Sequence, residues 1–209
     1  MGRKSLAIVT DLAEPDQISV MVDKTMDQFG QIDILINNSG IEGPITPVSN
    51  MDLAGWNHTL AVNLTGAMLS AKQVLNQSMI PRKKGAIVNI SSIAGRKGMA
   101  TRSPYNATKF AMIGLTQSLA FELGGLGIRV NCIAPGMVEG DRIDRVINSM
   151  SKGLGLTYEE AVAMINSRVA LGRMVKPGEI AALAVFLSSD KAGGITGQTI
   201  NCCGGMEMH

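Results

Sequence analysis

The sequence is poor in aromatic residues, histidine and cysteine, and these shortages limit what the protein can be. Aromatic side chains make up 3% of the 209 residues, so a core must be built from isoleucine, valine, leucine, alanine and methionine. The histidines (His58 and His209) and the cysteines (Cys132, Cys202 and Cys203) give neither the spacing of a metal site nor a disulfide framework. We therefore expect no metal, and free thiols in a reducing, cytoplasmic setting.

Long apolar runs and clusters of one charge are also lacking. No apolar run reaches the roughly 18 residues that a membrane helix needs, and the start of the chain does not resemble a signal peptide. The formal net charge is +2, and the lysines and arginines are scattered along the chain. Neither a membrane nor a nucleic acid is therefore expected as a partner.

Short apolar segments alternate with longer helical patterns, over a length that suits a single domain covering residues 1–209. The segments that predict strands are residues 5–11, 32–40, 85–92, 128–136 and 197–205. The patterns that predict helices are residues 15–30, 50–80 with Asn50 as the N-terminal cap, 105–123, pieces near 141–150 and 158–168, and 177–189. Nearly all-apolar strands that alternate with helices predict an α/β fold, a doubly wound parallel sheet with helices on both faces.

Polar and turn-forming residues follow the predicted strands. They are Asp11, then Asn37, Asn38, Ser39 and Gly40, then Ser91 and Ser92, then Pro135 and Gly136. Open parallel sheets bind their ligands at the carboxyl ends of the strands. These residues therefore predict the site of an extended ligand.

One of the two tyrosines, Tyr105, stands four residues before Lys109 in the stretch SPYNATKFAM. Residues four apart share one face of a helix, so the two side chains can converge. A nearby cation favours the phenolate and lowers the pKa of a tyrosine, which suits it to exchange a proton with a carbonyl or alcohol oxygen. The alternative is a surface pair on an amphipathic helix, which is the commoner meaning of this spacing when it stands alone.

Seven segments, in order, extend the pattern to nearly the whole chain: TDLAEP, NNSG, AVNLTG, IVNISSIAG, YNATK, RVNCIAPG and GITGQTINCCGG. With them the sequence resembles the short-chain dehydrogenase/reductase family. The resemblance implies a Rossmann-like fold and an oxidoreductase that transfers a hydride between NAD or NADP and a small carbonyl or secondary alcohol substrate. The closing segment resembles acyl-carrier-protein reductases, and polyol dehydrogenases end similarly. A homodimer or homotetramer is also implied.

The resemblance assigns roles to residues at matching positions. The implied catalytic residues are Asn63, Ser92, Tyr105 and Lys109. Ser92 would orient the substrate oxygen toward Tyr105, while Lys109 would hold the nicotinamide ribose and lower the pKa of Tyr105. Asn63 would hold a water that links Lys109 to solvent. The implied cofactor contacts are Asp11, Leu12, Asn37, Asn38, Ser39, Gly40, Tyr105, Lys109, Pro135, Gly136 and Val138.

Some of these residues also have purely structural interpretations. A strand-end serine can cap a turn, and that interpretation suits Ser91 better than Ser92. Asn63 can mark a kink in its helix. Gly140 stands where the family often has threonine.

The family's Gly-rich turn, which feeds a helix whose N-terminus faces the pyrophosphate, is missing. Residues 5–11 match the family's third strand, so we expect an N-terminally truncated fold in which the first two strands are absent. Residues 5–11 would then lack a partner. Residues 32–40 would form an apolar edge, which invites pairing with another chain. We therefore expect either a rearranged or swapped sheet, or a short sequence taken from a longer natural protein. The residue that selects NAD or NADP follows the second strand and is absent too.

A second function therefore stays open, a catalytically inactive fragment or interaction module that retains the oligomer surfaces. Apolar residues beyond one stripe of the 50–80 helix, namely Val62, Ala67 and Val74, support it. A wide contact with the chain's own core is the alternative. Residues 139–175 are expected to form the substrate loop and a mobile, mostly apolar lid. No cluster of arginines or lysines in that region indicates a large anionic substrate. Arg142, Arg145 and Arg173 are candidates to bind one, but we expect them to be solvated surface charges.

Overall fold

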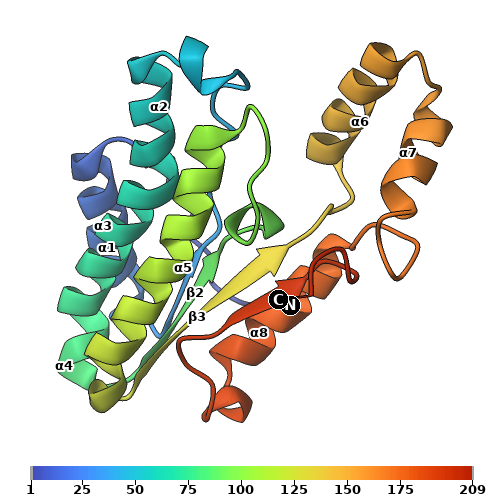
Figure 1. The fold of residues 1–209 in the computed structure, drawn as a ribbon. Helices are drawn as coiled ribbons and strands as arrows, with labels where there is room; N and C mark the ends of the chain where they lie inside the picture. The colour runs from blue at the N-terminus through green and yellow to red at the C-terminus, as the bar shows by residue number, and fades with distance from the viewer. Residues whose placement is uncertain (1, 209) are drawn as a thin grey trace.

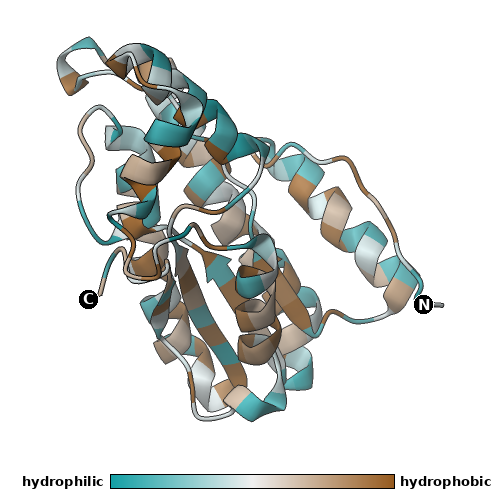
Figure 2. Ribbon diagram, turned by 90° about the vertical axis from the view of Figure 1, so that its right-hand side faces the viewer, coloured by the Kyte–Doolittle hydropathy of each residue, from teal (hydrophilic) through white to brown (hydrophobic). Residues whose placement is uncertain are grey.

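Four parallel strands form the centre of the fold. The computed structural model describes residues 2–208. Its strands are β1 (Ile34–Asn37), β2 (Gly85–Ile90), β3 (Ile128–Pro135) and β4 (Thr199–Cys202), in the order β1-β2-β3-β4. Most residues of β2 and β3 are buried, as expected for a parallel sheet covered on both faces. Figure 2 shows hydrophobic residues concentrated on these strands.

Helices cover both faces of the sheet (Figure 1), which confirms the expected doubly wound α/β architecture. On one face lie α3 (Gly66–Val74) and α5 (Ser103–Leu123), with α1 (Pro15–Phe29) packed on α3; α8 (Pro177–Ser188) covers the other face. Successive side chains of a strand point to opposite faces of the sheet, so neighbouring residues pack against different helices. Ile87 is buried on the side of α1, α3 and α5, while Val88 packs with α8.

A helical hairpin follows β3, formed by α6 (Asp141–Leu154) and α7 (Tyr158–Asn166). The hairpin has an apolar cluster of its own, which includes Ile147 and Ala161. The Tyr158 hydroxyl donates to Asp144 Oδ1 at 2.7 Å and ties the two helices together. The hairpin is thus one packed unit, and it occupies the region in which the sequence predicted a lid.

The long helix expected over residues 50–80 runs instead from Leu53 to Arg82. Its α-helical segments α2 (Leu53–Leu60), α3 and α4 (Ile80–Arg82) are joined by wider π-helical turns, η2 (Ala61–Thr65) and η3 (Leu75–Met79). The expected cap was wrong. Asp52 caps the helix by accepting from the Gly55 amide at 2.6 Å, the reach that an N-cap side chain has. Asn50 closes a separate 3-10 turn, η1 (Val48–Asn50), through its own amide.

The additional apolar residues of this helical run are used largely by the protein's own core. Ala67 and Val74 are 6% and 2% exposed. Leu53 and Met68 are 71% and 38% exposed and face outward. The alternative of a wide contact with the core is therefore confirmed for Ala67 and Val74.

The strand expected over residues 5–11 does not form. Figure 2 draws this segment outside the sheet, and the Leu6 and Val9 side chains are exposed. An extended segment needs a neighbouring strand to satisfy its backbone groups, and within residues 2–208 none lies beside it. The expected edge is confirmed: β1 ends the sheet, and Ile34 and Ile36 remain 47% and 43% exposed.

Two further observations apply to residues 2–208. None of the helices there combines the length and the apolar character needed to traverse a bilayer. No group of three or more histidine, cysteine, aspartate or glutamate side chains in this range is arranged to hold a metal ion.

Candidate active site

A cavity of about 810 Å³ opens at the carboxyl ends of β2 and β3. Parallel strands end at the same edge of a sheet, so residues far apart in the sequence meet there. Of the residues selected from the sequence, those that line the cavity are Asn38, Gly40, Ser91, Ser92, Tyr105, Lys109, Pro135, Gly136 and Val138. Most of the remaining wall is apolar and includes Ile90, Met137 and Ile180. A cavity is therefore present at the strand ends, where the sequence predicted a ligand site.

Tyr105 and Lys109 converge in this cavity from one face of α5. The helix begins at Ser103, and Pro104 occupies the first turn, where a missing amide costs no hydrogen bond. One turn separates Tyr105 from Lys109, and the Lys109 ammonium lies 5.6 Å from the centre of the Tyr105 ring. The simple surface pair is excluded, because the Lys109 side chain is 4% exposed.

The Lys109 ammonium is a buried cation with little compensation. It donates to the carbonyl oxygen of Ile90, the last residue of β2, at 2.8 Å. Desolvation by burial, reinforced by the charge of Arg142, lowers the pKa of Lys109 from 10.5 to about 8. Water solvates an ammonium better than this site does. Lys109 is therefore suited to bind a polar ligand group that accepts hydrogen bonds from its remaining N–H donors.

Two serines follow β2, and the one that caps the next turn is Ser92, not Ser91 as expected. Ser92 caps the short turn η4 (Ile93–Gly95) by accepting from the Ala94 amide at 3.1 Å. Ser91 is buried and donates to the Lys109 carbonyl oxygen at 2.7 Å, which fixes α5 to the strand. The capping interpretation that favoured Ser91 was therefore wrong. Only an outward serine can cap the turn, and Ser91 points inward because side chains alternate along the chain.

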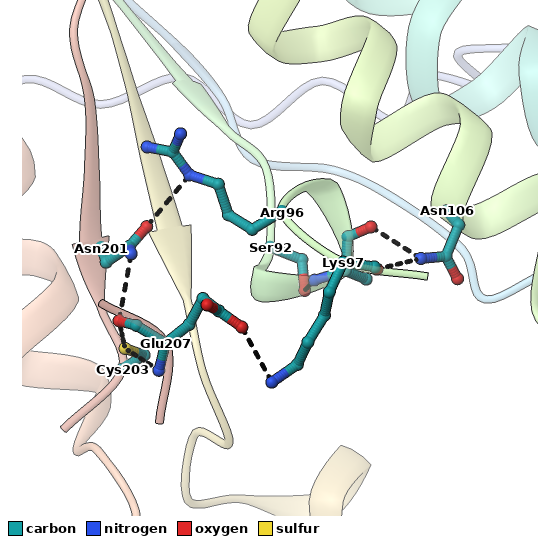
Figure 3. Close-up of polar contacts among 8 residues, drawn as sticks. Ser92, Arg96, Lys97, Asn106, Asn201, Cys203 and Glu207 are labelled. Carbon is teal, nitrogen blue, oxygen red and sulfur yellow. Dashed lines mark hydrogen bonds and ion pairs between the residues drawn. The ribbon is translucent and has the colours of Figure 1, made fainter. Parts of the chain in front are cut away.

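The loop that carries Ser92 is fixed on two sides (Figure 3). The Asn106 side chain, from α5, donates to the carbonyl oxygens of Ala94 and Lys97, each at 2.7 Å. On the other side Lys97 pairs with Glu207 at 2.9 Å. Arg96 Nε donates to Asn201 Oδ1 at 3.3 Å. The start of α5 and the C-terminal segment thus hold the loop together.

Gly95 allows the loop and α5 to approach closely, and this gives a first prediction. A Cβ at Gly95 would stand 2.5 Å from Ser91 Oγ and 2.6 Å from the Lys109 carbonyl oxygen. We expect Gly95→Ala to push α5 from the strand end, which would lower the free energy of unfolding by about 1–3 kcal/mol and reduce any turnover. Urea denaturation measures the first effect. Gly98→Ala is the matched control, since nothing lies within 4 Å of its Cβ position; equal stability of the two variants would contradict the close packing.

Arg142 is a site residue that the sequence analysis assigned to the surface. Although its side chain is 50% exposed, its guanidinium lies 5.6 Å from the centre of the Tyr105 ring. Arg142 Nε also donates to Glu42 Oε1 at 3.1 Å. Arg142 is exposed, as expected for a surface charge, but these contacts also place it at the cavity. No sequence signal joins Glu42 to Arg142, because 100 residues separate them.

The sequence comparison with protein families decides the relationship. A family model described as enoyl-(acyl carrier protein) reductase matches residues 1–207. The chain belongs to the short-chain dehydrogenase/reductase family. This membership confirms the expected family, its oxidoreductase class and, together with the sheet described above, the Rossmann-like fold.

Other members of the short-chain dehydrogenase/reductase family match nearly the whole chain. A dehydrogenase subunit of Thauera aromatica, named for (2S)-[(R)-hydroxy(phenyl)methyl]succinyl-CoA, is 36% identical over 99% of this chain and 78% of its own length. A 3-oxoacyl-[acyl-carrier-protein] reductase of Staphylococcus aureus is 35% identical over 99% of this chain and 79% of its own.

Solved structures of the same family agree with the fold. A variant of actinorhodin polyketide ketoreductase, crystallised with NADPH, has a TM-score of 0.91 and 34% identity, and the match covers 96% of this chain and 77% of that one. An NAD⁺-bound xylitol dehydrogenase has a TM-score of 0.86 and 31% identity, covering 94% and 77%.

In this short-chain dehydrogenase/reductase, Asn63 lies behind the cavity wall. It is 1% exposed and sits in the π-helical turn η2, as its interpretation as a kink residue requires. Its amide pairs with both backbone groups of Ile41, at 2.7 and 2.9 Å, and with Thr108 Oγ1 at 3.2 Å. A Cβ at Gly40 would lie 3.2 Å from Asn63 Oδ1 and 3.5 Å from Lys109 Nζ. Asn63 thus fixes the turn that borders Lys109.

Four of the expected cofactor contacts lie outside the wall of the cavity. Asn37 donates to Asn89 Oδ1 at 2.9 Å inside the sheet, and Ser39 is exposed. Asp11 accepts from the Ala13 amide at 2.9 Å in the turn before α1, and Leu12 lies against Gly66. The structure therefore brings together the residues near Lys109 but not the pair expected on the adenine side.

Gly140, which stands where the family often has threonine, adopts a backbone conformation that favours glycine. Its φ is +133°, and it immediately precedes α6. A threonine there would be strained. Glycine in place of threonine thus permits the backbone conformation from which α6 begins.

Proposed function

We propose that the protein interconverts a small ketone and its secondary alcohol with NAD or NADP, and that Tyr105 exchanges the proton. One observation carries the proposal: Ser92, Tyr105 and Lys109 line one largely apolar cavity at the carboxyl ends of β2 and β3. The family membership supports hydride transfer as the reaction, and both nicotinamide cofactors occur in similar structures. The comparisons do not favour the alternative of an inactive interaction module, since these relatives are named as enzymes.

The chain's own residues supply proton transfer and orientation. A bound nicotinamide supplies the hydride that joins the carbonyl carbon, or takes it back in the reverse direction. During reduction the electron pair of the C=O bond moves to oxygen, and the Tyr105 hydroxyl gives that oxygen its proton. The Ser92 hydroxyl donates to the same oxygen and orients it. The apolar wall limits the access of water.

The residues present fit the nicotinamide end of the cofactor. Lys109 would hold the nicotinamide ribose, because its ammonium has donors beyond the one used by Ile90. Gly40 leaves the ammonium accessible, since a Cβ there would lie 3.5 Å from Nζ. Asn63 would act as a positioning residue behind that turn, and Asn38, Pro135, Gly136 and Val138 would border the ring.

The phosphate and adenine end fits less well. Within residues 2–208 no strand leads through the Gly-rich turn that the family uses for the pyrophosphate. Asp11, Leu12, Asn37 and Ser39 stay predictions as cofactor contacts.

We also propose a cytoplasmic homodimer or homotetramer. The cysteines are free, which suits a reducing compartment. Phe110 and Phe121 on α5 are 47% and 93% exposed, together with Met68 on α3. Exposed aromatic and methionine side chains are typical of subunit contacts.

Cofactor binding followed by ketone reduction tests the proposed function. We expect NADH or NADPH to bind saturably when nucleotide fluorescence is followed, and a panel of small ketones to be reduced with consumption of the bound nucleotide. Because the Lys109 ammonium anchors the ribose, both nucleotides should bind through the same end. A folded protein that binds neither nucleotide, at any concentration tested, would contradict the proposal.

A further inference from the structure

A second cavity of about 690 Å³ adjoins the one that holds Tyr105 and Lys109. The two cavities share Gly40, Glu42, Arg102, Arg142 and Val146, so a ligand can extend from one into the other. Three arginines and a single carboxylate line the second cavity: Arg102, Arg142, Arg145 and Glu42. Its charge is therefore positive, whereas Glu139 and Asp141 line only the first cavity.

Glu42 bridges two of these arginines. Its Oε1 accepts from Arg142 Nε at 3.1 Å, and its Oε2 lies 3.4 Å from Arg102 Nη1. The three side chains come from different parts of the fold: the loop after β1, the residue before α5, and the first turn of α6. A carboxylate is thus already accommodated between these guanidinium groups.

The interaction with Glu42 leaves the outer edge of Arg142 available. Glu42 uses Nε, and among residues 2–208 no hydrogen bond involves either terminal nitrogen of Arg142. Those two nitrogens form the planar fork that binds a carboxylate through two parallel hydrogen bonds. The fork belongs to a guanidinium 5.6 Å from the Tyr105 ring, between Glu42 and the reaction centre.

We propose that Arg142 binds a carboxylate of the substrate, so that the protein acts on an oxo acid and its hydroxy acid. The proposal rests on the proposed function, since it places the carbonyl at Tyr105. The substrate carboxylate would point toward the second cavity, because Glu139 and Asp141 would repel it in the first. The largely apolar wall between the two ends suits a short carbon chain.

Paired substrates that carry the same ketone, with and without a negatively charged carboxylate, test this inference. The probes are acetoacetate and levulinate, each compared with its methyl ester, in the presence of the nucleotide that binds. We expect the protein to reduce at least one acid with a kcat/KM about tenfold or more above that of its ester. Arg142→Met should lower kcat/KM for that acid by about 10- to 100-fold, the size of a hydrogen-bonded charge pair. Its effect on the ester should be at least about fivefold smaller, because the ester loses only the influence of the Arg142 charge on Tyr105 and Lys109.

Two further variants separate binding from general damage. Arg142→Lys keeps the charge but loses the fork, so its kcat/KM for the acid should fall between those of the unaltered protein and Arg142→Met. Arg168→Met is the matched control, since Arg168 is exposed and lines neither cavity. It should leave kcat/KM unchanged for both the acid and the ester.

The outcomes distinguish this inference from the proposed function. Equal rates for acid and ester in the unaltered protein, or equal losses for both in Arg142→Met, would overturn the inference and leave ketone reduction intact. If no ketone is reduced, the proposed function fails. Ligand-observed NMR then decides whether the carboxylate site exists. The carboxylate site is supported if the protein binds levulinate but not its ester, and if Arg142→Met loses that binding. The inference is overturned if levulinate does not bind in this way.

Discussion

Replacing Tyr105 by phenylalanine is expected to abolish most ketone reduction while leaving cofactor affinity almost unchanged. General acid catalysis contributes about a hundredfold to ten-thousandfold, and kcat should fall by that factor. Phenylalanine keeps the ring near the Lys109 ammonium and the Arg142 guanidinium, each 5.6 Å from its centre, so packing is preserved. Steady-state kinetics and nucleotide fluorescence measure the two quantities in the same preparation.

The protein's other tyrosine provides the control for this experiment. Tyr158→Phe removes a phenol of the same kind, but one that joins α7 to Asp144 of α6, away from the wall of the first cavity. Its kcat should stay within a few-fold of the unaltered protein. Turnover that survives in Tyr105→Phe would show that another group moves the proton. Parallel losses in both variants would point to damage of the fold.

The central strands and their helices were predictable because local patterns encode them. Residues 85–90 and 128–135 are mostly apolar without the alternation of a one-sided strand, and such a run is typical of a strand between two helical layers. Residues 5–11 have the same apolar character but form no strand, because a strand also needs a neighbour. Burial thus depends on what surrounds a segment, and composition alone does not report it. The cap at Asp52 was missed for a related reason, since the preceding 3-10 turn shifts where the helix begins.

The candidate site was predictable where its geometry is set by spacing within one element. Tyr105 and Lys109 lie one turn apart on α5, so their convergence follows from helical periodicity. The contact between Glu42 and Arg142 depends on how the α6–α7 hairpin sits over the loop after β1, which no local pattern encodes. Asn63 illustrates an intermediate case. Its place in a helix was foreseen, but its pairing with Ile41 depends on a tertiary contact.

Replacing Lys109 by methionine is expected to weaken nucleotide binding and turnover, and at the same time to change how stability depends on pH. Loss of the ammonium removes the proposed ribose ligand, so kcat/KM should fall by about 100-fold or more. Burial lowers the pKa of Lys109 from 10.5 to about 8, which means that folding disfavours its charged form. At neutral pH that cost is about 3 kcal/mol, from the free energy per pKa unit, and methionine avoids it. Loss of the hydrogen bond to Ile90 offsets part of this gain.

The pH dependence isolates the titration of Lys109 from the other effects of the substitution. Between about pH 8 and pH 10.5 the unfolded chain keeps the lysine proton that the folded protein has released. The free energy of unfolding therefore rises with pH in this window, and the cost is fully present below it. From pH 7.5 to pH 9.5 the unaltered protein should gain about 2 kcal/mol relative to Lys109→Met in urea denaturation.

Lys72→Met, at an exposed position on α3, should follow the unaltered protein at both pH values. Parallel pH curves for the unaltered protein and Lys109→Met would mean that the ammonium is solvated. A solvated ammonium would remove the physical reason for treating it as a preformed anchor for the ribose.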